Sequence, residues 1–145
     1  MAIDQAVCNS FKKELLEGIH DFESGGDQFK LALYEDTANL SAATTAYPGD
    51  STGGQVGDTG EYSQGGGVLQ SQQTGLDTGV AIVTFANLSF TGVTLTARGA
   101  LIYNATESDK AVAVLNFGGD KTATAGTFTI QFPAFTSTAA ILRIS

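Results

Sequence analysis

Histidine and cysteine, the side chains that most often act as a catalytic base or nucleophile, are rare in this chain, and the two that are present lie in the same N-terminal segment. The sequence holds one histidine, His20, and one cysteine, Cys8. A hydrolytic triad needs a base beside its nucleophile, and a zinc site needs three or four ligands. We therefore expect no enzyme and no cofactor. His20 is interpreted as a partly exposed residue near a helix end, and Cys8 as a small apolar residue on the helix face.

The paired carboxylates fall where turns are expected. Glu35-Asp36 and the pair Glu107 and Asp109 follow strand-like runs, and such residues are usually solvated and bonded to local backbone. Nothing here indicates a buried carboxyl with a shifted pKa for general acid–base work. The site prediction is accordingly that catalytic, cofactor and metal residues are all absent.

Calcium is the alternative that the acidic residues leave open. Asp50, Asp58 and Glu61 lie in a Gly-rich stretch, and oxygen-rich loops can hold this ion, but the spacing matches no EF-hand. The run Gly65-Gly66-Gly67 is not followed by the Lys and Ser/Thr of a phosphate-binding loop. Whether this stretch binds calcium or a glycan stays open at the sequence level.

The charge balance excludes several partners. Lys and Arg number 7 against 15 Asp and Glu, a formal charge of -8, so no basic face is available for nucleic acid or an anionic membrane. No run of 18 apolar residues is present, and the first residues lack the basic and apolar regions of a signal peptide. We expect synthesis in a cytoplasm, from which the protein could still leave inside a particle.

Residues 5–22 have the spacing of an amphipathic helix. Asp4 is the expected N-cap, Gly18 a possible kink, and Gly25-Gly26 the expected stop. Five apolar residues recur at spacings of three and four, which places them on one stripe: Val7, Phe11, Leu15, Ile19 and Phe22.

The rest of the chain alternates with the period of strands. A half-buried strand is expected at residues 29–34, an irregular Gly-rich loop or arm at 37–67, and a run of strands from 68 onward. Within that run we expect separate strands at 90–95 and 97–105, a hairpin at 107–110, a central strand at 111–117, a turn at 118–121, and further strands at 80–85, 127–132 and 140–145. Short strands at even spacing predict a mainly β fold: one domain over 1–145, an antiparallel β-sandwich or jelly-roll-like barrel with one N-terminal α-helix within 1–25 and a main β body at 68–145.

Six segments carry a resemblance to a known group of proteins. They are FKKELLEGIH at 11–20, FKLALY at 29–34, TARGALIYN at 96–104, KAVAVLNFGGDK at 110–121, FTIQFP at 128–133 and AILRI at 140–144. In this order they resemble small virion structural proteins of tailed bacteriophages of the podovirus-like marine type. The resemblance implies a capsid decoration, or cement, protein that binds the outside of the head shell and stabilises the lattice. It also implies the major capsid protein as partner and the virion capsid surface as location.

A protein of this kind needs contact surfaces rather than a titratable site. We expect a homo-oligomer, a dimer or trimer, with the helix stripe and the Gly-rich stretch as contact elements; the stripe could instead cover the sandwich, and the loop could be merely mobile. The alternative is a host-surface or glycan-binding module on a tail or head fibre, suggested by the exposed Thr- and Gly-rich loops and by Tyr47 and Tyr62. Arg98 and Arg143 are each expected to pair with a carboxylate or with the shell subunit, the internal pair being favoured. The candidate interface residues are Phe11, Leu15, Ile19, Tyr47, Pro48, Tyr62, Arg98 and Arg143.

Overall fold

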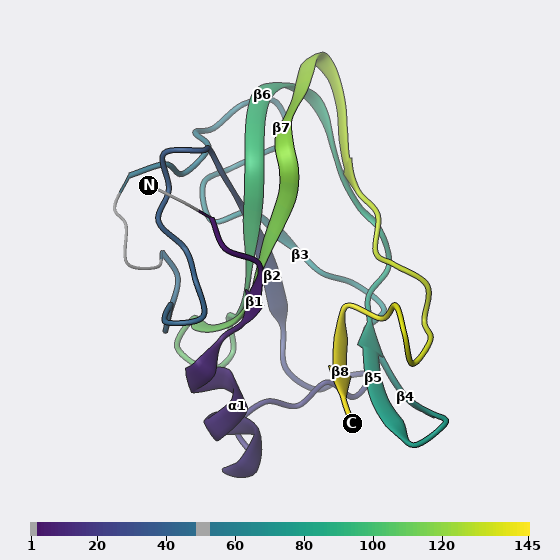
Figure 1. Cartoon of the computed structure of the whole chain (residues 1–145). Helices are drawn as coiled ribbons and strands as arrows, with labels where there is room; N and C mark the ends of the chain where they lie inside the picture. Colours follow the sequence, from purple (N-terminus) through teal and green to yellow (C-terminus); the bar gives the residue numbers. More distant parts are fainter. Residues whose placement is uncertain (1–2, 49–52) are drawn as a thin grey trace.

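The computed structural model describes residues 3–48 and 53–145. It is mainly β, with 48% strand and 6% helix in two antiparallel sheets, which confirms the predicted fold class. The elements follow one another along the chain as shown in Figure 1. They are β1 (Ala6–Val7), α1 (Asn9–Leu16), β2 (Phe29–Tyr34), β3 (Gly67–Val68), β4 (Gln73–Asp77), β5 (Val80–Thr84), β6 (Leu88–Asn104), β7 (Lys110–Ile130) and β8 (Leu142–Ile144).

A long hairpin forms the body of the molecule. β6 and β7 pair from Leu88↔Ile130 to Asn104↔Lys110, with several register shifts on the way, and the two strands bend over together at the end distant from α1 (Figure 1). The five-stranded sheet has the order β1-β7-β6-β2-β3. The predicted hairpin at 107–110 is therefore confirmed.

The prediction of short separate strands within this hairpin is wrong. The strands predicted at 90–95 and 97–105 are parts of one strand, β6, which ends at Asn104, and the expected turn at 118–121 lies inside β7. Gly92 and Gly118 both have positive φ, at 64° and 81°. Such residues are accommodated as bulges that bend a strand without ending it, so glycine here marks curvature and not a turn.

The predicted helix over 5–22 is too long at both ends. Ala6 and Val7 pair with β7 as β1, with Ala6 opposite Val114. The N-cap of α1 is Cys8, which is fully buried. At the other end Gly18, with φ 71°, follows the C-cap; its N–H donates to the Leu15 carbonyl and the N–H of Ile19 donates to the Glu14 carbonyl. This pair of bonds is the Schellman motif, so Gly18 terminates the helix where a kink was expected.

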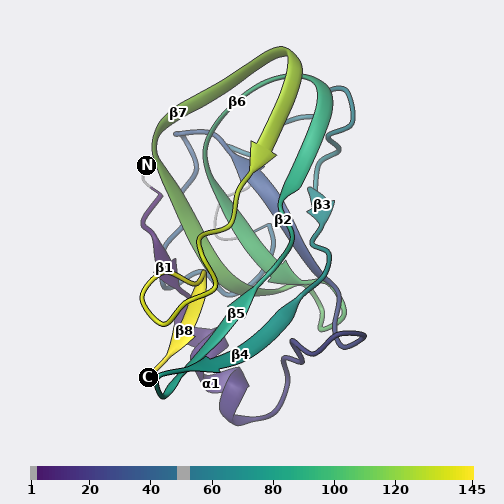
Figure 2. The ribbon, with the colours of Figure 1, turned by 90° about the vertical axis from the view of Figure 1, so that its right-hand side faces the viewer.

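The small sheet packs beside α1 and has the order β4-β5-β8. The β4–β5 hairpin closes through Thr78 and Gly79, both with positive φ, as a two-residue turn that follows the strand twist requires. β8 pairs with β5 and lies on the side of β5 that faces α1 (Figures 1 and 2). The predicted strands around 80–85 and 140–145 are confirmed.

The strand predicted at residues 29–34 is confirmed with its bounds as β2, but it is buried on both faces and not half-buried. The described residues of the Gly-rich segment, 37–48 and 53–67, pack against it and add Leu40, Val56 and Tyr62 to the core. Val56 donates its N–H to the Leu33 carbonyl, and Leu31 pairs with Gly67. The described part of the segment therefore pairs with the free edge of β2 and covers it.

Candidate functional site

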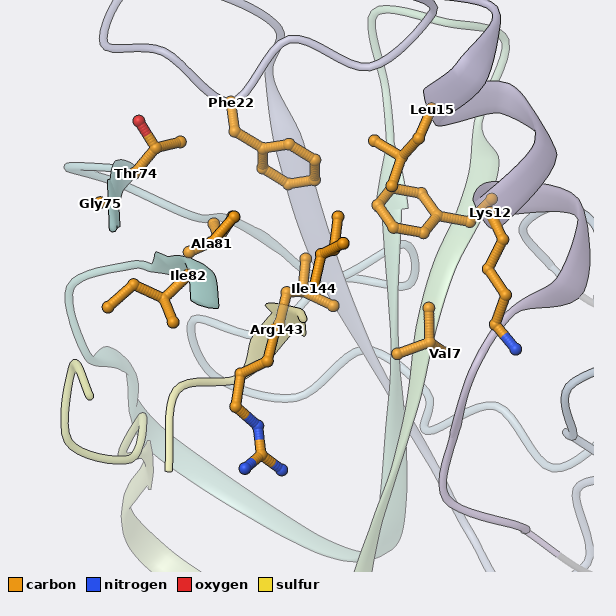
Figure 3. A pocket seen from close by; sticks show the side chains of 13 residues that line it. Val7, Lys12, Leu15, Phe22, Thr74, Gly75, Ala81, Ile82, Arg143 and Ile144 are labelled. Carbon is orange, nitrogen blue, oxygen red and sulfur yellow. The ribbon is translucent and has the colours of Figure 1, made fainter. Parts of the chain in front are cut away.

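The principal candidate site is an apolar groove between α1 and the small sheet. Its volume is about 420 Å³. Phe11 and Leu15 of α1 form one wall, and Ala81 of β5 and Ile144 of β8 form the other, with Phe22 beside them (Figure 3). This amount of space suits one or two large apolar side chains of a ligand.

Polar groups are few in this groove. Among the described lining residues the side chains that carry nitrogen or oxygen are those of Thr74, Lys12 and Arg143, and no Asp or Glu is present. Figure 3 shows the charged ends of Lys12 and Arg143 extending toward the same side, on either side of Val7. The groove is thus apolar along most of its length and cationic at one side.

Exposed apolar side chains continue the surface beyond the groove. Leu16 of α1 is 91% exposed, Leu76 of β4 is 76% exposed and Ile144 is 57% exposed. Leu76 and Ile144 both lie opposite Ala81 in the strand register, so the three side chains form one row on the same face of the small sheet.

The structure separates the predicted residues of α1 into different roles. Phe11 is only 3% exposed and packs in the core, with its ring centroid 4.8 Å from that of His20 and 5.9 Å from that of Phe22. Leu15 is half-buried and lines the groove. Ile19 is half-buried and follows the end of α1. The helix stripe therefore covers the sheet with Phe11 and leaves Leu15 at the groove.

The two arginines have different partners. Arg98 makes the expected internal ion pair, with its Nε 2.9 Å from Oδ1 of Asp120. Arg143 lines the groove and donates to the Thr138 carbonyl, and it has no ion pair with any described residue. The charge of Arg143 is therefore available to a partner, whereas that of Arg98 is already balanced.

The predicted contact residues of the Gly-rich segment hold that segment down. Tyr62 is 1% exposed, and its hydroxyl accepts the N–H of Leu33. Tyr47 is half-buried, stacks on Tyr103 at 4.5 Å and donates to Gln55. Pro48 is exposed, but its carbonyl accepts the hydroxyl proton of Tyr34.

All four tyrosines of the sequence, Tyr34, Tyr47, Tyr62 and Tyr103, lie in this cluster. Burial raises the pKa of each of them, and that of Tyr62 to about 12. A buried phenol ionises late because the charged form loses its water. The tyrosines therefore stay neutral at physiological pH and hold the segment through hydrogen bonds.

Glycines let the same segment pack closely, Gly66 against β2 and Gly54 against another part of the segment. A Cβ added at Gly66 would lie 1.7 Å from the Leu31 carbonyl oxygen, and one at Gly54 would lie 2.6 Å from the Ala38 backbone. Only a residue without a side chain fits at such distances. The glycines were interpreted from the sequence as a sign of an irregular loop, but in the structure they allow close packing.

His20 is buried, contrary to the prediction of a partly exposed residue. Its side chain has no exposed surface, and Nε2 lies 2.9 Å from Oε1 of Glu14. Asn104 Nδ2 lies 2.9 Å from His20 Nδ1 and donates to Asp27 as well. The amide oxygen of Asn104 accepts the N–H groups of Thr106 and Glu107, which fixes the amide orientation and makes Nδ1 the acceptor.

This histidine network was not found from the sequence. The sequence feature that could have indicated it is Asn104, which directly follows the strand-like run at 100–103. A side-chain amide buried at such a place needs several hydrogen-bond partners. The network fastens the segment between α1 and β2 onto the end of β6.

The acidic residues of the Gly-rich segment bind backbone groups. Asp58 accepts the N–H of Gln64, and Glu61 accepts the N–H of Thr91. Hydrogen bonds from the Thr91 side chain and backbone hold the pKa of Glu61 below its ordinary value. Asp50, the third residue of the calcium hypothesis, lies outside the described residues. No group of three or more Asp, Glu, His or Cys side chains in the described ranges could hold a metal ion.

Within residues 3–48 and 53–145 no helix has the length and apolar character that a membrane crossing requires. Comparison of the chain with protein-family models, with curated proteins and with solved structures found no match in any of the three.

Proposed function

We propose that this protein is a virion structural protein that decorates the outside of a phage head and stabilises the capsid lattice. The observation that carries a binding role is the apolar groove with its exposed neighbours Leu16, Leu76 and Ile144. Large exposed apolar patches on a folded domain mark interaction sites, because leaving them in water is unfavourable. The head, the major capsid protein as partner and the capsid surface as location are supported by the sequence resemblance.

The rest of the fold suits a static role in an assembly. β2 and the adjoining end of the central hairpin, residues 100–104 and 111–115, are buried on both faces, and four tyrosines hold the Gly-rich segment. A rigid domain loses little conformational entropy when it binds. A shell presents many identical sites, and a decoration protein that is itself a dimer or trimer gains avidity from them.

The test is the copy number and position of the protein in purified particles. Quantitative mass spectrometry should give a ratio to the major capsid protein of the order expected for a lattice component, and a head reconstruction should place the domain outside the shell. A few copies for each particle, located on the tail, would overturn the proposal and favour the fibre alternative. Binding of the isolated domain to a glycan array would then test that alternative directly.

A further inference from the structure

The groove between α1 and β8 has the charge pattern of a site for an acidic ligand. The chain carries 15 acidic residues and only 7 basic ones, yet the described groove lining includes Lys12 and Arg143 and no carboxylate. Neither cation has an ion pair with a described residue. A ligand carboxylate at this side of the groove would therefore find an unbalanced positive charge at Arg143, and Lys12 adds a second positive charge on the same side (Figure 3).

The extent of the apolar surface distinguishes a protein segment from a small molecule. Leu76, Ala81 and Ile144 form one row across the small sheet, and Leu16 lies next to groove residue Leu15. A small ligand would fill the 420 Å³ groove and leave Leu16 and Leu76 in water. A polypeptide covers both the groove and its flanks, as interface cores usually do.

The backbone next to the groove suits an extended ligand. β8 is an edge strand of the small sheet. It is the edge that lies on the side toward α1 (Figures 1 and 2). An edge strand presents backbone groups with which an added strand can pair. An extended segment beside β8 would direct alternate side chains into the groove.

We propose that this groove binds an extended protein segment that carries a bulky apolar side chain next to an Asp or Glu. The apolar side chain lies between Leu15 and Ile144, and the carboxylate pairs with Arg143 on the side of the groove where Lys12 also lies. The bound segment belongs to the shell subunit; this assignment rests on the proposed function. The groove chemistry itself does not depend on that assignment.

A peptide experiment tests the groove chemistry independently of any particle. The probe is a fluorescein-labelled peptide of alternating leucine and aspartate, and its matched control has lysine in place of each aspartate. We expect saturable binding of the aspartate peptide by fluorescence anisotropy. Arg143→Glu, Lys12→Glu and Ile144→Asp should each weaken it about tenfold or more, since like charges or a charge in the apolar wall oppose the bound state. Both charge reversals are at exposed positions, and Ile144 is 57% exposed, so each variant should fold.

Lys121→Glu is the control variant, because it makes the same charge change at an exposed site outside the groove. It should bind like the unmodified protein. Hydrogen exchange should slow at the amides of Leu142, Arg143 and Ile144 when the aspartate peptide is added. No binding, equal binding of both peptides, or an equal loss with Lys121→Glu would overturn the proposed chemistry.

A second arm uses particles that lack the protein. If the unmodified protein coats them and Ile144→Asp does not, both proposals are supported. If both proteins coat them, the groove is not the shell contact although the decoration role stands. If neither coats them while the peptide results hold, the decoration role fails and the groove serves another protein. A sedimentation shift to a dimer that Ile144→Asp abolishes would overturn the proposed segment in favour of a second copy.

Discussion

Gly66 offers the sharpest test of how the Gly-rich segment is held against the sheet. Gly66 and Gly79 have nearly the same φ, 84° and 83°. A Cβ at Gly79 would meet nothing within 4 Å, whereas one at Gly66 would lie 1.7 Å from the Leu31 carbonyl oxygen. Alanine at either site therefore costs about 1 kcal/mol for its left-handed backbone. Only alanine at Gly66 also clashes with the neighbouring strand.

The clash sets the magnitude of the difference. Carbon and oxygen in close contact are normally about 3.3 Å apart, so Gly66→Ala must move β2 and the segment apart by roughly 1.6 Å. That movement breaks the Leu31↔Gly67 pairing and strains the bond from the Tyr103 hydroxyl to the Gly65 carbonyl. We expect Gly66→Ala to lose about 3–5 kcal/mol of unfolding free energy and Gly79→Ala about 1 kcal/mol.

Equilibrium urea denaturation followed by circular dichroism measures both variants. With an m-value of about 2 kcal/mol/M, the midpoint of Gly66→Ala should fall by more than about 1 M relative to Gly79→Ala. If Gly66→Ala does not yield folded protein, Tyr103→Phe should still lose about 1–3 kcal/mol, because the buried carbonyl of Gly65 loses its donor. Equal midpoints for the two alanine variants would refute the account of a tightly packed segment.

Three further predictions concern the polar groups. The raised pKa of Tyr62, about 12, means that above pH 10 the unfolded chain releases this proton first, so the contribution of Tyr62 to stability is present below pH 10 and falls by about 2–3 kcal/mol by pH 12. The other three tyrosines, whose pKa values are also raised, add to this loss; denaturation at several pH values should show the sum, reduced by about 2–3 kcal/mol in Tyr62→Phe. Asn104→Ala should cost about 2–4 kcal/mol by urea denaturation, since it leaves Nδ1 of buried His20 and the N–H of Thr106 without their side-chain partners; a loss below about 1 kcal/mol would contradict the network. Arg98→Ala should cost less than about 1 kcal/mol, because its ion pair is exposed; a larger loss, or one unaffected by salt, would contradict this.

Local periodicity predicted the elements that one face or one turn decides. The alternation at 29–34 gave β2, and the spacing of Leu142 and Ile144 gave β8. The amphipathic stripe at 5–22 predicted a helix of the right phase but the wrong length. Its first residues pair with β7, and a long-range strand partner is not visible in local spacing.

Glycine was the residue most easily misread from the sequence. Gly18 ends α1, Gly92 and Gly118 bend continuous strands, and Gly66 permits close packing. Each of these roles depends on what lies opposite the glycine, which is set by the tertiary fold. The same limit applies to Tyr62 and Phe11, predicted as contact residues and found buried.

Of the candidate site, the sequence identified Leu15 and Arg143 but not the place where they meet. Residues of α1 and β8 are more than a hundred positions apart in the chain, and the groove exists because α1 and the small sheet line it from opposite sides (Figure 3). Lys12, which lines the groove, was not among the predicted contact residues.

The most direct test of the central claim is a head reconstruction at side-chain resolution. We expect this domain on the outer surface of the shell, with an extended segment of the shell subunit between α1 and β8 and a carboxylate paired with Arg143 on the side of the groove where Lys12 also lies. A domain bound through another face, with the groove open to solvent, would contradict it.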